Sequence, residues 1–232
     1  MSLRSLALTA SSMALVVSAS ASAELVAGWT ITTAFPTGTG SVPTGTFYTV
    51  GAADQGALTT GSSLDSIHAA AAATYTSPSG NGSQYSFSSN NWQIGDYYEA
   101  RLSTVGFSDI NLSWDQARSS TGPSAFELIM SVDGGTNWVT MLASYTVLQS
   151  GGGGAPGTWS SLTYNALYTT TVSLAGAENQ AQVIVRFRAT GAAGGASGSN
   201  RIDSVMFYSG PVPAPGAIAL LGLAGLVGRR RR

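Results

Sequence analysis

The sequence predicts an all-β protein, a single antiparallel β-sandwich, on three observations. Short segments alternate apolar and polar residues, which is the period of a strand with one wet face. Turns rich in Gly, Ser and Asn separate these segments. No sustained 3.6-residue pattern runs through the middle of the chain. Many short strands spaced by turns of this composition favour a sandwich.

The expected elements follow in chain order. Segment 63–74 is the one candidate helix, an insertion of about three turns, because its alanines favour helix. Strands are expected within 97–105, 109–116, 125–132 and 181–190. The residues predicted to face inward are Tyr98, Ala100, Leu102, Ile110, Leu112, Trp114, Phe126, Leu128, Met130, Val132, Val183, Val185 and Phe187. The residues assigned to the wet face are Tyr97, Glu99, Arg101, Ser103, Asp109, Asn111, Ser113, Asp115, Arg186 and Arg188.

Glycine-rich turns join these strands. Asp133-Gly134-Gly135 predicts a tight hairpin, because glycine accepts the positive φ of primed turns, and the returning strand is expected to begin at Trp138. Gly151 to Gly154 and the stretch 191–200 are expected to be surface loops.

The charge balance argues against nucleic acid as a partner. The 232 residues hold ten arginines, no lysine and 11 acids. Five arginines lie near the two ends, so residues 24–210 keep five against all 11 acids, a net charge near −6. Proteins that bind nucleic acid need clustered Arg and Lys to neutralise phosphates. The absence of cysteine excludes thiolate chemistry, and one histidine leaves little for acid–base catalysis.

The N-terminal residues 1–23 have the layout of a secretory signal peptide. Arg4 precedes an apolar run over 6–17, and Ala21-Ser22-Ala23 is the small-x-small pattern that signal peptidase cleaves. Cleavage after Ala23 leaves Glu24 as the first residue of the exported chain. The alternative is a buried N-terminal helix.

The C-terminal residues 210–232 have the layout of a membrane-directed tail. An apolar run of 11 residues, Ala217 to Val227, precedes four arginines, Arg229, Arg230, Arg231 and Arg232. Even counted from Pro213, a helix to Val227 rises only about 22 Å, short for a bilayer core of about 30 Å. The arginines are expected to stay cytoplasmic by the positive-inside rule, leaving the domain at 24–209 outside. A simple C-terminal membrane anchor is the alternative to a sorting signal.

Two parts of the chain resemble known families of exported bacterial proteins. The phrases GDYYE (95–99), SVDGGTNW (131–138) and RIDSV (201–205) resemble a jelly-roll domain of secreted bacterial proteins. The C-terminal segment resembles a PEP-CTERM-type sorting signal in which Pro213-Ala214-Pro215 stands in place of the usual Pro-Glu-Pro. This resemblance implies recognition by an exosortase-type membrane enzyme and a final place at the cell surface or in the extracellular matrix.

Few residues are candidates for chemistry. His68 lies in the alanine-rich segment without a plausible triad and is expected at the surface or half-buried. Asp96 and Glu99 flank tyrosines at a strand start and are expected to be solvated. The jelly-roll resemblance implies Asp203 as a ligand of a structural calcium ion, with an oxygen from the Glu24 region. The alternative is an ion pair of Asp203 with Arg201 or Arg188.

Three tryptophans beside loops are candidates for stacking on sugar rings. They are Trp92, Trp138 and Trp159. An exposed indole can stack on the apolar face of a sugar, and equally it can pack a loop onto the sandwich. The sequence therefore leaves two main hypotheses, a non-enzymatic exported surface or matrix protein and a module that binds extracellular polysaccharide. A hydrolase is a weaker third, because no nucleophile and base stand out.

Overall fold

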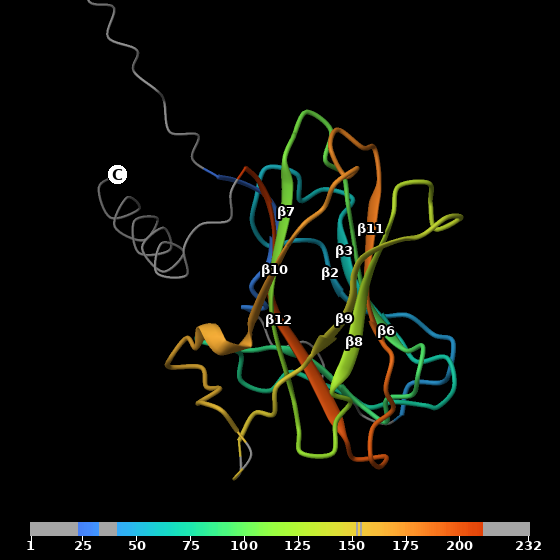
Figure 1. Ribbon diagram of the computed structural model, residues 1–232, viewed down its shortest axis with the longest axis vertical. Helices are drawn as coiled ribbons and strands as arrows, with labels where there is room; N and C mark the ends of the chain where they lie inside the picture. The colour runs from blue at the N-terminus through green and yellow to red at the C-terminus, as the bar shows by residue number, and fades with distance from the viewer. Residues whose placement is uncertain (1–22, 33–40, 152, 154, 211–232) are drawn as a thin grey trace, which may run out of the picture.

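The computed structural model describes residues 23–32, 41–151, 153 and 155–210, and these form an all-β sandwich of two antiparallel sheets (Figure 1). The first sheet runs β10 (Thr169–Ser173), β7 (Ile110–Arg118), β12 (Ser199–Ser209), β5 (Phe87–Asn90) and β4 (Tyr75–Thr76), and β1 (Glu24–Trp29) also pairs with β12. The second sheet runs β2 (Tyr48–Gly51), β3 (Ser63–Ile67), β6 (Tyr97–Leu102), β11 (Val183–Ala189), β8 (Ala125–Ser131) and β9 (Val139–Thr146). Apart from Ala23, Glu24 and Gly210, the expected signal peptide and sorting signal lie outside the described residues.

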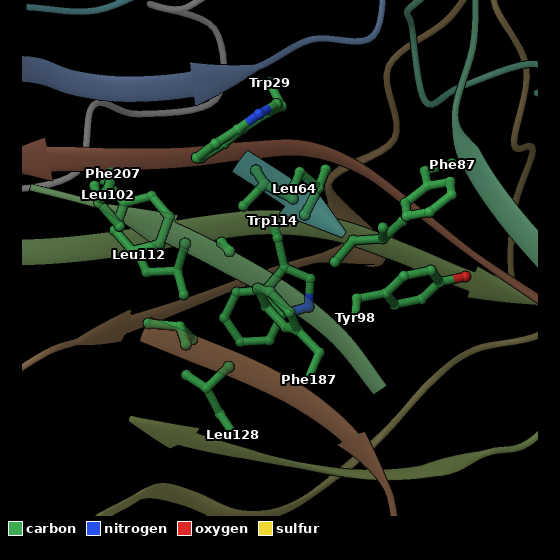
Figure 2. Close-up of a cluster of buried hydrophobic side chains, with 14 of the residues drawn as sticks. Trp29, Leu64, Phe87, Tyr98, Leu102, Leu112, Trp114, Leu128, Phe187 and Phe207 are labelled. Carbon is green, nitrogen blue, oxygen red and sulfur yellow. The ribbon is translucent and has the colours of Figure 1, made fainter. Parts of the chain in front are cut away.

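The core lies between the two sheets and is rich in large aromatic side chains (Figure 2). Trp114 of β7 packs edge-on against Phe187 of β11, with ring centroids 5.1 Å apart, so the two sheets meet there. Twelve of the thirteen side chains predicted to face inward are buried. Val132 is 41% exposed instead, because β8 ends at Ser131 and the chain has already entered the turn.

The expected helix at 63–74 is wrong. Residues Ser63–Ile67 form β3, which pairs antiparallel with β6 and is buried at Leu64. The alanines that follow lie in an irregular segment before β4. Helix propensity is a weak preference, and here the pairing of β3 with β2 and β6 overrides it.

The hairpin between β8 and β9 is confirmed. Gly134 and Gly135 take positive φ values of 76° and 91°. The Asp133 carboxylate accepts hydrogen bonds from the backbone N–H groups of Thr136 and Asn137, at 3.0 and 2.9 Å. These bonds and those of neighbouring side chains lower the pKa of Asp133 to about 2. The loop expected at 191–200 is two residues shorter, because β12 begins at Ser199.

Some side chains that the alternation assigns to the solvent-exposed faces are buried. Glu99 and Asp115 were expected on wet faces, yet neither is more than 2% exposed. Arginine side chains cover Glu99 on the second sheet. On the first sheet the β4–β5 loop (77–86) and segment 155–168 cover Asp115 and its neighbours. Two hydrogen bonds join the loop to the segment: the Asn81 amide donates to Asn165 O, and Asn165 N donates to Asn81 Oδ1.

A β-bulge in β12 divides that strand between two partners. Its register shifts between Asp203 and Met206, and Ser204 takes a positive φ of 48°. Before the bulge β12 pairs with β5, and after it with β1, while β7 pairs along its other edge. Glu24 thereby lies opposite Ser209, so both ends of the described sandwich leave it side by side.

Candidate functional site

The outer face of the second sheet presents an arginine held between two aromatic rings. The Arg186 guanidinium carbon lies 4.1 Å from the ring centroid of Tyr97 and 4.1 Å from that of Trp138. All three side chains are partly exposed. We call these three residues the Tyr97–Trp138 face. The guanidinium occupies one face of each ring, and the exposed part of each ring is what a planar or apolar group could contact.

A buried carboxylate fixes this arginine. Glu99 is the cross-strand partner of Arg186, and its Oε2 accepts from Arg186 Nε at 2.5 Å. Its other oxygen accepts from Arg101 Nε at 2.5 Å. One fully buried carboxylate therefore serves two guanidinium groups, and the cluster keeps one net positive charge. The fixed arginine in turn fixes the orientation of both rings.

Local structure places each ring on this face. Tyr97, Glu99 and Arg101 are alternate residues of β6, so their side chains share one side of the sheet. Trp138 ends the β8–β9 turn, and its indole N–H donates to Gly135 O at 3.0 Å. Burial raises the pKa of the Tyr97 hydroxyl, opposed by the nearby arginine, so the phenol stays neutral. Phe47 extends the apolar part of the surface and is 47% exposed beside Arg101.

The structure does not bring the three candidate tryptophans together. Trp138 lies on the second sheet and Trp159 over the first. Trp92 is fully buried, packs against Tyr98 and Phe126, and donates its indole N–H to Ser89 O at 2.9 Å. A sugar cannot reach it, so the expectation that Trp92 stacks on a glycan is wrong.

Trp159 lies in segment 155–168 and remains partly exposed. Its indole N–H donates to Ser79 O at 2.7 Å, and its ring meets Tyr168 edge-on at 5.1 Å. The Arg201 guanidinium carbon lies 6.0 Å from the Trp159 ring centroid. Trp159 thus both packs a loop onto the sandwich and leaves part of its ring at the surface.

The surroundings of Asp203 do not fit a calcium ion. Its carboxylate accepts from Asn81 N at 2.8 Å, Ser83 Oγ at 2.6 Å and Ser204 N at 2.7 Å. Calcium needs six to eight converging oxygen ligands, whereas hydrogen-bond donors converge here. Glu24 lies opposite Ser209, about 20 Å further along β12, so its region is not beside Asp203.

The alternative of an ion pair at Asp203 is not formed either. Arg188 pairs with Glu127 at 2.6 Å, and Arg201 contacts no carboxylate in the described part of the chain. Asp203 instead lies opposite another acid, Asp115 of β7. Burial raises the pKa of Asp203 to about 6 and that of Asp115 to about 7, and Asp203 adds to the shift of Asp115. No arginine of the described residues forms an ion pair with either of these two buried acids.

His68 is buried, which corrects the expectation that it lies at the surface or is half-buried. The side chain is 2% exposed, with Nδ1 2.9 Å from Asp96 Oδ2 and Nε2 3.0 Å from Ser89 Oγ. Asp96 was expected to be solvated, yet it is fully buried and also accepts the backbone N–H groups of Ala69 and Gln93. The carboxylate thereby ties the segment after β3 to the turn before β6.

This order of serine, histidine and aspartate is that of a hydrolase triad, and sequence reasoning missed it. The three residues come from separate segments, and no local motif connects them. Ser89 and His68 are at most 2% exposed, so no substrate carbonyl can reach the hydroxyl. His68 also packs against Trp92, with ring centroids 4.6 Å apart. The geometry therefore describes a buried polar connection within the core.

The sequence contained one usable signal for the Tyr97–Trp138 face. Arg186 lies on a strand between inward Val185 and Phe187, so its place on an outer face could be predicted. Its partners could not, because Glu99 lies on β6 and Trp138 ends the β8–β9 turn, and only the topology of the sheet brings these beside β11.

Comparisons with known proteins give distant structural similarities. No family model matches the sequence, and no curated protein matches it. The chain is similar to the K1 cleaved adhesin domain of Lys-gingipain from Porphyromonas gingivalis W83, with 13% identity, a TM-score of 0.43 and coverage of 79% of this chain and 98% of that domain. It is also similar to the CBM22-1 xylan-binding domain from Paenibacillus barcinonensis Xyn10C, with 8% identity, a TM-score of 0.38 and coverage of 84% of this chain and 100% of that domain. With TM-scores below 0.5, these similarities carry no conclusion about the fold or function of this chain.

Two further findings limit the possible sites. Within residues 23–32, 41–151, 153 and 155–210, no three His, Asp or Glu side chains gather as metal ligands. The same residues hold no helix long and apolar enough to span a membrane.

Proposed function

We propose that this chain is an exported, non-enzymatic protein of the cell surface or extracellular matrix whose sandwich binds extracellular glycan. One observation carries the glycan part: Tyr97 and Trp138 stand on an open sheet face with their orientation fixed by Arg186. Rings fixed before binding lose little conformational freedom when a sugar stacks on them, which favours affinity.

Export and sorting are the other part of the proposal. The signal peptide at 1–23 and the Pro-Ala-Pro, apolar and arginine layout at 210–232 support delivery by signal peptidase and an exosortase-type membrane enzyme. A jelly-roll sandwich carried on such a tail would then stay outside the membrane. The buried state of Ser89 and His68 supports a role without catalysis.

A glycan array with the purified full chain tests the binding proposal. We expect neutral polysaccharides to bind the wild type, and Trp138→Ala to weaken that binding about 2- to 10-fold, the range of one aromatic stacking contact. Leu162→Ala is the control, since Leu162 is 93% exposed in segment 155–168, which lies over the first sheet and not over the Tyr97–Trp138 face. Silence of the folded protein across the array, or equal loss in both variants, contradicts glycan binding through this face.

Localisation tests the sorting proposal separately. Replacement of Arg229 to Arg232 by serine is expected to leave the chain unprocessed or released from the cell envelope. The measurement is the distribution of the chain between envelope and medium, with its mass before and after export. A variant that is processed and placed like the wild type contradicts the sorting proposal, whatever the array shows.

A further inference from the structure

Arg201 is a partly buried cation that has no hydrogen-bond acceptor among the described residues. The other four arginines of the described residues all have one: Arg101 and Arg186 contact Glu99, Arg188 contacts Glu127, and Arg118 donates to three backbone carbonyls. No hydrogen bond or ion pair is formed by Arg201 with the described residues, and its Nε is buried without a partner. Burying the Nε of a guanidinium without a partner is costly, and burial lowers the pKa of Arg201. Its Nη1 and Nη2 groups are not buried without a partner, so they are the groups that a ligand could reach.

The strand pairing explains why the neighbouring strands of the first sheet provide no hydrogen-bond acceptor for Arg201. The cross-strand partners of Arg201 are Ser88 of β5 and Ala117 of β7. Ser88 donates its hydroxyl to Asn200 O, and alanine has no polar group. The next outward residue of β12 is Asp203, whose carboxylate is already occupied by three donors.

The covering segment supplies flat rings and no acceptor. Trp159 lies 6.0 Å from the guanidinium carbon, and Tyr168 packs edge-on against Trp159. The Tyr168 hydroxyl shares its single proton between Gln149 O at 3.0 Å and Gly157 O at 2.8 Å, and the Trp159 indole donates to Ser79 O, so both rings are fixed. An unpaired guanidinium next to a rigid, partly exposed indole is thus the chemistry of this place.

We infer that Arg201 and Trp159 form a second binding site, on the sheet opposite the Tyr97–Trp138 face, for the uronate units of an acidic glycan. The ligand's carboxylate would accept from the guanidinium in the paired geometry that arginine favours. The apolar face of the same sugar would stack on the Trp159 ring. A singly charged group fits better than a phosphate or sulfate cluster, since one unpaired cation is present and Asp115 and Asp203 lie on the same sheet face.

This site goes beyond the proposed function because it lies on the first sheet and binds its ligand through a charged group. Titration calorimetry of the full chain with a galacturonate oligosaccharide, and with its methyl ester as the uncharged match, tests the inference. We expect the acid to bind at least about 10-fold more tightly than the ester, as a hydrogen bond between charged groups implies. Equal affinities for acid and ester would overturn the site.

Substitutions of Arg201 distinguish the contribution of its charge from that of its planar guanidinium group. Arg201→Gln is expected to lose at least about 10-fold in affinity for the acid and little for the ester. Arg201→Lys keeps the charge without the planar fork and should fall between the two. Arg188→Gln removes one charge from an ion pair on the other sheet and is expected to bind as the wild type does. If Arg201→Gln retains wild-type affinity, the inference is wrong.

Stability provides a readout that binding alone does not. Without ligand, Arg201→Gln should unfold at the same temperature as the wild type or higher, because it removes an unpaired buried charge. If that variant fails to fold, the acid–ester comparison on the wild type decides the inference alone, and equal affinities for acid and ester overturn it. A polyglutamate peptide that binds as tightly as the uronate would assign the site to acidic peptides instead. Neutral-glycan binding that Trp138→Ala weakens and Arg201→Gln leaves intact belongs to the proposed function alone.

Discussion

The buried acids Asp115 and Asp203 predict that this protein loses stability as the pH rises from 5 to 8. Their pKa values are raised to about 7 and about 6 in the folded state, against about 3.9 for an unfolded aspartate. Between those values the folded state holds protons that the unfolded state has released, so rising pH favours unfolding. The contribution is complete below about pH 4 and lost by about pH 7.

The size of the effect follows from the two shifts. From pH 5 to 8 the Asp115 carboxyl contributes a loss of about 3 kcal/mol in the free energy of unfolding and Asp203 about half as much, together about 4 kcal/mol. The substitution that isolates Asp115 is Asp115→Asn. The Asp115 carboxyl accepts from Thr169 Oγ1 at 2.5 Å, while its Oδ2 is buried without a partner. The amide oxygen keeps the acceptor for Thr169, and the substitution removes the titratable charge.

Urea unfolding followed by tryptophan fluorescence at pH 5, 6, 7 and 8 and constant ionic strength measures this. We expect Asp115→Asn to be more stable than the wild type at pH 8 and to keep only about a third of the pH dependence. Asp109→Asn, at an exposed position, is the control and should reproduce the wild-type profile. A wild-type stability that is flat or rises from pH 5 to 8, or an Asp115→Asn profile as steep as the wild type, would refute the reasoning.

Three further outcomes are expected. Glu99→Gln should lower the free energy of unfolding in urea by about 2 to 3 kcal/mol, which is low for a broken buried ion pair because the two arginines are partly exposed. The more exposed pair is the control, and Glu127→Gln should lower the same free energy by under about 1 kcal/mol. Equal losses in the two variants would count against the shared carboxylate. Gly80→Ala should lower the melting temperature by about 3 to 10 °C, because its Cβ would overlap Ser83 Oγ and Asp203 Oδ2, and an unchanged melting temperature would mean that the β4–β5 loop packs differently. Calcium followed by chelator should leave the melting temperature unchanged, because donors surround Asp203, and a calcium-dependent rise would restore the calcium hypothesis.

The alternation of apolar residues predicted the sandwich because it reports which side chains must leave water. It placed Trp114 and Phe187 inward, and the structure packs them together across the core. The same alternation was wrong about Glu99 and Asp115, since period 2 says which face a side chain takes and nothing about what covers that face. The cover consists of arginines from another strand and of loops, which are long-range features of the topology.

Local preference misled at segment 63–74 for a related reason. Its alanines favour helix by fractions of a kcal/mol each, while pairing with β2 and β6 buries Leu64 and satisfies the backbone. The contacts of His68 were out of reach because Ser89 and Asp96 are 21 and 28 positions away in sequence. The sequence shows Arg201 only as one charge on the closing strand. Its lack of an acceptor among the described residues depends on which strands and loops surround it, and these are set by the topology.

The position of β12 determines how the sandwich would respond to pulling. Force applied at Gly210 runs along this strand, which is bonded to β7 on one edge and to β5 and then β1 on the other. Drawing β12 out lengthwise must shear the hydrogen bonds on both edges together, whereas an edge strand peeled sideways loses them one after another. A domain attached through Gly210 would therefore stay folded while a bound polymer pulls on it. Forced unfolding, which depends on the unfolding rate, would be slow.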